Sequence, residues 1–149
     1  MRHADPDTPQ ISLIVPVYNC ERYLPDQLDA LLSDCAMRME VIAVDDGSRD
    51  GSMAILQAYG ARDARLRIFG QPHVGQSAAR NAGLQAARGT WVAFADADDI
   101  LPAAALAAWF QQAVAQNLDV LIGNGYRFTQ SPRRLSRPPC LQGSPSAGR

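Results

Sequence analysis

The chain has 149 residues, of which 47% are hydrophobic and 19% are charged, and its formal net charge is −1. This length and composition predict a single globular domain with a buried core and exclude a largely disordered chain. All 14 basic residues are arginine, and they form no basic stripe, so nucleic acid is not an expected partner.

The chain divides by composition into three parts. Residues 1–10 are polar and contain acids and prolines, which predicts a loose N-terminal arm and no leader sequence. Residues 129–149 are rich in Pro, Arg and Ser and are expected to form a tail. The domain should therefore lie within residues 11–128. The three cysteines show no C-x-x-C spacing, which favours a reducing compartment and no disulfide framework.

Strands and helices are expected to alternate along the domain. Apolar, β-branched runs predict strands at residues 11–17, 40–44, 66–69, 90–95 and 118–122. Helical spacing or helix-forming composition between these runs predicts helices at residues 24–35, 50–61, 75–88 and 102–116. This order predicts an α/β fold with a mostly parallel sheet and helices on both faces. No run reaches the roughly 18 apolar residues of a transmembrane segment, so we expect a cytoplasmic protein or one bound peripherally at the inner membrane surface.

Acidic residues follow two of the predicted strands, at the edge where open α/β sheets bind ligands. Asp45 and Asp46 follow one strand, and Asp96 and Asp98 follow another. If the backbone stays extended after Ala95, Asp96 and Asp98 project to the same side, which suits Mg²⁺ or Mn²⁺ together with a phosphate.

Each acidic cluster also has a purely structural explanation. An isolated D-x-D sequence is more often a solvated loop with helix-capping acids, and Asp45 and Asp46 are equally compatible with an Asx turn in which Asp50 caps the next helix. Two acidic strand ends at one edge concentrate negative charge, however, and this favours a ligand site. A lone histidine in a loop is usually just exposed, and we assign His73 no role.

Four successive motifs resemble the signatures of family 2 glycosyltransferases, which have the GT-A fold. They are PVYNCERYL at 16–24, VDDGSRDGS at 44–52, GQSAARNAGL at 75–84 and FADADD at 94–99. Because four motifs occur in the right order over residues 11–125, the resemblance is far more specific than any single motif. It implies transfer of a sugar from a nucleoside-diphosphate sugar to a saccharide or lipid-linked acceptor, in biosynthesis of cell-surface polysaccharide or lipopolysaccharide.

The resemblance also implies roles for individual residues. The nucleotide-sugar site would comprise Pro16, Val17, Tyr18, Glu21, Asp45, Asp46, Gln76, Arg80, Asn81, Asp96, Ala97 and Asp98. The first four would line the nucleoside pocket. Asp46 would bind the base, and Asp45 would support the loop of Asp46. Arg80 would lie near the diphosphate, with Gln76 and Asn81 shaping the same wall. Asp98 would be the principal ligand of Mn²⁺ or Mg²⁺, with Asp96 beside it at the ribose or sugar. Asp99 would either support Asp98 or cap the following helix.

The chain departs from the family pattern after the fourth motif. The catalytic base of such enzymes lies many tens of residues further on, whereas here Asp119 is the only acid after Asp99, and the predicted strand places it opposite the site. We therefore expect this chain to bind donor without transferring sugar, and we expect self-association through uncovered apolar surface.

Four other protein classes explain the sequence less well. A receiver domain and a P-loop hydrolase both need a lysine, and the chain has none. A dinucleotide oxidoreductase needs G-x-G-x-x-G after the first strand. A haloacid-type phosphatase would use Asp96 and Asp98 but leaves the other motifs unexplained, and it remains a distant alternative.

Overall fold

The computed structural model describes residues 8–33 and 36–123. The chain forms two compact units, residues 1–107 and residues 108–149. The first contains a four-stranded sheet in the order β3-β2-β1-β4, with every neighbouring pair parallel. The predicted α/β class with a parallel sheet is confirmed.

The two central strands are the most buried segments of the sheet. β1 (Ile11–Val17) and β2 (Met39–Asp45) are buried at every residue and pair from Ile11 and Met39 to Val17 and Asp45. β3 (Leu66–Gly70) and β4 (Trp91–Phe94) lie at the edges and are partly exposed. Near-continuous apolar runs are typical of strands covered on both faces, because a polar side chain on either face needs a buried partner, as Ser12 and Glu40 provide for each other.

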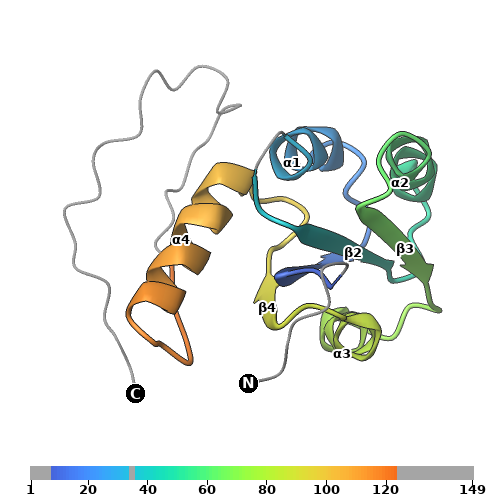
Figure 1. Cartoon of the computed structure of the whole chain (residues 1–149). Helices are drawn as coiled ribbons and strands as arrows, with labels where there is room; N and C mark the ends of the chain where they lie inside the picture. Colours follow the sequence, from blue (N-terminus) through green and yellow to red (C-terminus); the bar gives the residue numbers. More distant parts are fainter. Residues whose placement is uncertain (1–7, 34–35, 124–149) are drawn as a thin grey trace. The chain divides into compact units, whose positions relative to one another are not determined.

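Helices cover both faces of the sheet, as predicted (Figure 1). α1 (Leu24–Leu31) and α2 (Ser52–Gly60) lie on one face, and α3 (Gln76–Ala86) packs on the other against β1 and β2. The approach of α3 is close, because a Cβ atom added at Gly83 would lie 2.5 Å from Cγ2 of Ile14. Small residues on α3 therefore set the distance between the helix and the sheet.

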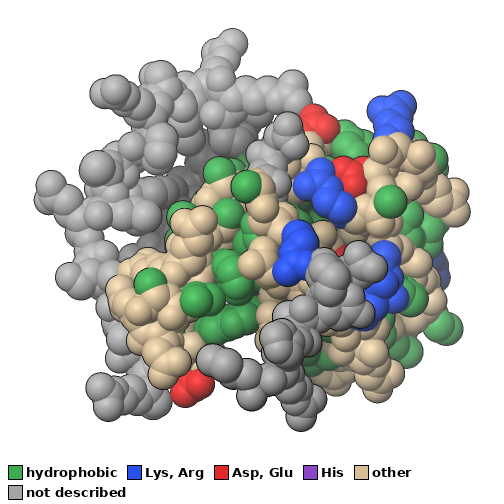
Figure 2. Space-filling view, in the orientation of Figure 1, with side chains coloured by type: hydrophobic (Ala, Val, Ile, Leu, Met, Phe, Trp, Pro, Cys, Tyr) green, Lys and Arg blue, Asp and Glu red, His purple; other side chains and the backbone are tan. Residues whose placement is uncertain are grey.

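Arginine side chains are spread over the surface and several are neutralised by acids. Arg65 pairs with Asp63 at 2.6 Å, and Arg67 pairs with Glu40 at 2.8 Å. On the face shown in Figure 2, the basic side chains lie apart, among uncharged and acidic ones. The described side chains on this face form no basic stripe of the kind that follows a nucleic-acid backbone.

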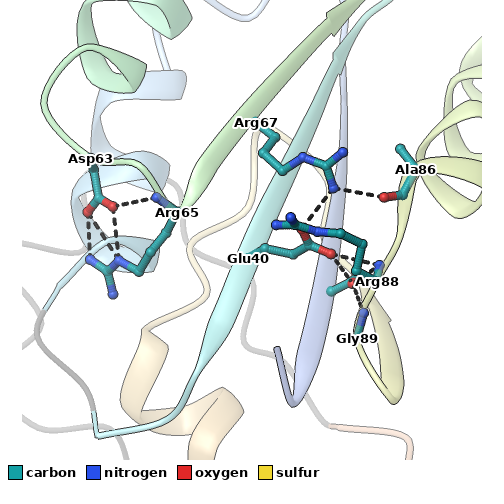
Figure 3. Close-up of polar contacts among 8 residues, drawn as sticks. Glu40, Asp63, Arg65, Arg67, Ala86, Arg88 and Gly89 are labelled. Carbon is teal, nitrogen blue, oxygen red and sulfur yellow. Dashed lines mark hydrogen bonds and ion pairs between the residues drawn. The ribbon is translucent and has the colours of Figure 1, made fainter. Parts of the chain in front are cut away.

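A buried carboxylate joins the amino ends of the sheet (Figure 3). Glu40 is 2% exposed; its Oε1 accepts hydrogen bonds from Ser12 at 2.6 Å and from the N–H of Arg88 at 2.8 Å. Its Oε2 faces the guanidinium groups of Arg67 and Arg88, both at 2.8 Å. Burial opposes ionisation, but these hydrogen bonds outweigh it and lower the pKa of Glu40 to about 2. The cluster stabilises the end of the sheet away from the acidic strand ends.

The fifth predicted strand is wrong. α4 (Ala103–Ala115) begins in the first unit and ends in the second, and residues 118–122 after it are not a strand. Val120 and Ile122 are 59% and 73% exposed. A β-branched run becomes a strand only where a neighbouring strand pairs with its backbone, and the described residues provide no such pairing.

Some predicted features lie outside the described residues. These are Cys35 at the end of the first predicted helix, residues 1–7 of the N-terminal arm, and the tail at 129–149. α1 itself ends at Leu31. Within the described residues, none of the helices combines the length and hydrophobicity needed to span a bilayer.

Candidate functional site

A pocket of about 350 Å³ opens at the carboxyl ends of the strands, all of it within the first unit. Its volume is in the range of small-molecule sites. The lining residues are Pro16, Val17, Tyr18, Cys20, Asp46, His73, Gln76, Asp96, Ala97 and Asp98. All but Cys20 and His73 are among the residues predicted to bind a nucleotide sugar. Parallel strands produce this convergence, because all their carboxyl ends meet at one edge of the sheet.

The carboxylate of Asp46 is held by the loop that follows β3. Oδ1 accepts hydrogen bonds from Gln71 at 2.6 Å and from the N–H of Val74 at 3.0 Å. Oδ2 accepts one from the N–H of Gly75 at 2.9 Å and faces Nδ1 of His73 at 2.8 Å. Burial opposes ionisation of Asp46, but these four contacts outweigh it and lower its pKa to about 2. Asp46 is therefore ionised, and the protein itself supplies its donors.

Asp45, the last residue of β2, supports the turn after the strand. Its Oδ2 accepts a hydrogen bond from the N–H of Ser48, three residues further on, at 3.1 Å. Gly47 within this turn has a φ of +73°, and a Cβ atom there would lie 2.9 Å from the backbone N of His73. The turn thus needs glycine in order to pack against the loop after β3. Asp45 does not line the pocket.

The loop after β1 is joined to the loop after β2 by several hydrogen bonds. Oδ1 of Asn19 accepts one from the N–H of Arg49 at 2.8 Å. Oε2 of Glu21 accepts one from the N–H of Gly51 at 2.6 Å, and Oδ2 of Asp50 accepts one from the N–H of Glu21 at 3.0 Å. Glu21 thus supports the loops and is not among the pocket-lining residues, unlike Pro16, Val17 and Tyr18.

Asp96 and Asp98 both line the pocket, although the strand does not continue through them. β4 ends at Phe94, and the N–H of Asp99 bonds to the carbonyl of Asp96 at 3.1 Å, which closes a turn. The expected alternation of extended side chains therefore does not apply. The turn nevertheless brings both carboxylates to the pocket, because it bends the chain across the strand ends.

α3 contributes partners for Asp96. Oδ1 of Asp96 accepts hydrogen bonds from Arg80 at 2.6 Å and from Gln76 at 3.1 Å. Arg80 and Asn81 do not line the pocket, and Asn81 is exposed. In this structure Arg80 thus neutralises an acidic strand end, which relieves part of the charge repulsion expected from the sequence.

Gln27 is a site residue that the sequence analysis missed. It belongs to α1 and is fully buried. Its amide nitrogen donates to the carbonyl of Asp96 at 3.3 Å, and its amide oxygen accepts from the N–H of Leu101 at 2.9 Å. One side chain therefore holds both ends of the loop that carries Asp96 and Asp98. A polar residue on the otherwise apolar buried face of a helix was the only sequence signal.

The arrangement of acids suits a cation that is shared with a phosphate. Asp98 and Asp99 are largely exposed. Partial desolvation of the Asp99 carboxyl, together with the negative charges of Asp98 and Asp96, raises the pKa of Asp99. Within the described residues, no hydrogen bond engages Oδ2 of Asp96 or either carboxylate oxygen of Asp98, and no group of three or more His, Cys, Asp or Glu is placed to hold a metal. Magnesium-type ions commonly take one or two carboxylates plus substrate phosphates, so the residues present fit such an ion.

An aromatic pair forms one wall of the pocket. The rings of Tyr18 and His73 are stacked, with 4.0 Å between centroids and an angle of 17° between planes. The side chains of Tyr18 and His73 are 40% and 55% exposed. Nothing in the local sequence indicated this role for His73, because its partners are distant along the chain. Cys20 lines the same pocket, and burial raises the pKa of its thiol, which keeps it protonated.

Relatives and structural neighbours of the chain are glycosyltransferases. EpsJ of Bacillus subtilis (strain 168), an uncharacterized glycosyltransferase, is 40% identical over 134 residues, which are 90% of this chain and 39% of that protein. Among solved structures, S. aureus TarS 1–349 in complex with UDP-GlcNAc matches this chain with a TM-score of 0.68 and 30% sequence identity. The match covers 82% of this chain and 37% of that one.

A second neighbour contains a metal. The mannosyltransferase PcManGT from Pyrobaculum calidifontis, in complex with GDP-Man and Mn²⁺, is 27% identical with a TM-score of 0.59, over 64% of this chain and 29% of that one. The chain thus spans at most 39% of the length of these three proteins. The family model described as glycosyl transferase family 2 matches residues 12–145. Its parallel sheet with helices on both faces is that of the GT-A fold. The chain therefore belongs to glycosyl transferase family 2.

Proposed function

We propose that this chain binds a nucleoside-diphosphate sugar in the pocket at the strand ends, and that the protein transfers the sugar to a saccharide or lipid-linked acceptor. The observation that carries the proposal is the convergence of Tyr18, Asp46, Asp96 and Asp98 on one pocket of ligand size. The TarS complex with UDP-GlcNAc supports it, because that neighbour has the same fold at 30% identity. The family membership removes the phosphatase alternative.

Within this proposal, the two sides of the pocket have different tasks. Tyr18 presents an aromatic face to the base, and Asp46 presents an ionised acceptor to a ring N–H. Asp98, with Asp96 beside it, holds Mn²⁺ or Mg²⁺. Such an ion supplies neutralisation of the charge that develops on the departing diphosphate. Arg80 lies next to Asp96, where its guanidinium adds positive charge close to the same group.

The transfer itself replaces one bond at the sugar. An acceptor oxygen bonds to the anomeric carbon, the bond from that carbon to the diphosphate breaks, and a carboxylate removes the acceptor proton. Asp119, the only acid after Asp99, is exposed and lies in the second unit. We assign no base within the chain. We propose that residues 11–128 form the donor-binding domain and that the chain by itself binds donor without efficient transfer.

Calorimetry with UDP and UDP-GlcNAc tests the donor site. We expect binding in Mn²⁺ and at least a tenfold weaker affinity in chelator, because without a cation the carboxylates repel the negatively charged diphosphate. Asp98→Asn should remove most of this metal dependence while leaving the fold intact, since the side chain is exposed. Asp119→Asn is the matched control and should bind as the wild type does.

Two results would contradict the proposal. Equal affinity with and without metal would exclude the metal role of Asp98, and no binding of either nucleotide would exclude the donor site. Incubation with sugar nucleotides and a panel of saccharide and lipid acceptors, followed by mass spectrometry, measures transfer separately. Product formed at ordinary enzyme rates, above about 1 per second, would show that the base lies within this chain.

A further inference from the structure

The His73 side chain lies in the pocket as a planar nitrogen heterocycle that makes two contacts. Its ring stacks on Tyr18 with centroids 4.0 Å apart. Its Nδ1 lies 2.8 Å from Oδ2 of Asp46 and 3.1 Å from the carbonyl oxygen of the same residue. Both of these oxygens are acceptors, so Nδ1 carries a proton and donates. The imidazole is thus an aromatic ring whose N–H points at a carboxylate.

These two contacts are those that a pyrimidine or purine base makes in a protein pocket. A base presents a flat aromatic face to a tyrosine ring, and the ring N–H of uracil, thymine or guanine is a donor to a carboxylate. The pocket contains the stacking surface and the acceptor side by side, on Tyr18 and Asp46. His73 therefore occupies both features that would recognise a base.

The acceptor positions of Asp46 are already filled. A carboxylate offers about four lone-pair positions, and Asp46 receives donors from Gln71, His73, Val74 and Gly75. Two of these donors are backbone N–H groups, which cannot leave without moving the loop. The His73 side chain is 55% exposed, so rotation about its side-chain bonds can carry it into solvent while the backbone N–H groups stay in place. The other side-chain donor, Gln71, is only partly exposed, so His73 is the donor that a ligand displaces most easily.

We infer that His73 is an internal competitor for the nucleobase: its imidazole fills the base subsite of the free protein and leaves when a nucleotide binds. This inference rests on the proposed donor site. It makes nucleotide affinity depend on the fraction of molecules in which the ring has moved out. If the closed form is favoured about ten to one, the apparent Kd is about tenfold higher than that of the open form. The loop after β3 thereby sets the donor concentration at which the site fills.

A series of substitutions at position 73 tests the inference through UDP affinity in Mn²⁺. His73→Ala removes both the stacked ring and the donor, and we expect UDP to bind about tenfold more tightly. His73→Phe keeps a ring but cannot donate to Asp46, so its affinity should lie between those of the wild type and His73→Ala. Gln57→Ala, an exposed change on α2 outside the pocket lining, is the control and should bind UDP as the wild type does. Circular dichroism verifies that each variant is folded.

Proton NMR of the histidine rings follows the movement directly. The chain has two histidines, and His3→Ala assigns the Hε1 signal of His73. In the free protein that signal should be displaced by the Tyr18 ring, and saturating UDP should move it toward the position of a solvated imidazole. Two results would overturn the inference while leaving the donor site standing. One is that His73→Ala binds UDP no more tightly than the wild type does. The other is that the His73 signal stays displaced in the UDP complex. Absence of UDP binding by both the wild type and His73→Ala would overturn the donor site and the inference together.

Discussion

Replacing Glu40 by Gln should destabilise the fold by an amount that follows from its contacts. The substitution keeps the size of the side chain but removes the charge that faces Arg67 and Arg88. The pKa of Glu40 falls from 4.5 to about 2 on folding. Each pKa unit is worth about 1.4 kcal/mol, so this difference corresponds to roughly 3 kcal/mol of folding stability at neutral pH. The Arg67 and Arg88 side chains are 29% and 60% exposed, and screening by water reduces the expected loss to about 2 to 3 kcal/mol.

The pH dependence distinguishes a charge effect from a packing effect. A group whose pKa is lowered in the folded state stabilises it above the unfolded pKa and ceases to do so as the pH falls through the folded pKa. The Glu40 contribution should thus be complete above about pH 4.5, less than half at pH 3 and nearly absent at pH 2. Urea denaturation of the wild type and Glu40→Gln, followed by circular dichroism at pH 7 and pH 3, measures it.

A matched acid-to-amide change provides the control. Asp63→Asn breaks the ion pair between Asp63 and Arg65, whose side chains are 23% and 31% exposed respectively. It should therefore lower the free energy of unfolding by less than about 1 kcal/mol. A loss below about 1 kcal/mol for Glu40→Gln at pH 7, or the same loss at pH 7 and pH 3, would refute the argument that ionised Glu40 stabilises the sheet.

Two further substitutions test the support of the site. Gly83→Ala should lower the free energy of unfolding measured in urea by about 1 to 3 kcal/mol, because the new methyl group would meet Ile14 at 2.5 Å and push α3 from the sheet. An unchanged midpoint of urea denaturation would show that α3 shifts freely. Gln27→Leu should raise the Mn²⁺ concentration needed for UDP binding, since it releases the loop of Asp96 and Asp98. Leu56→Ala, a core change on α2, controls for lost stability. Equal metal dependence in both variants would limit Gln27 to a structural role.

The central part of the fold was predictable from the sequence because it depends on local pattern. The run at Ile11–Val17 matched β1 residue for residue, since it is apolar except for Ser12 and is buried throughout. The acids after β2 and β4 were expected at one edge because parallel strands all end there. In contrast, residues 118–122 had a strand composition but no partner strand within the described residues, and pairing decides whether such a run forms a strand.

The roles of individual side chains were decided only by the tertiary structure. Sequence indicated that Asp46 would face a ligand, but four donors from a loop about 25 residues later hold its carboxylate. Gln27 reaches Asp96 across 69 positions, and Tyr18 stacks on His73 across 55. Hydrogen bonds and ring contacts depend on distance and angle in space, and these are set by how the helices pack on the sheet. Local periodicity therefore determined which elements form and which edge carries the acids, while packing determined which acids are already satisfied by the protein and which remain open to a ligand.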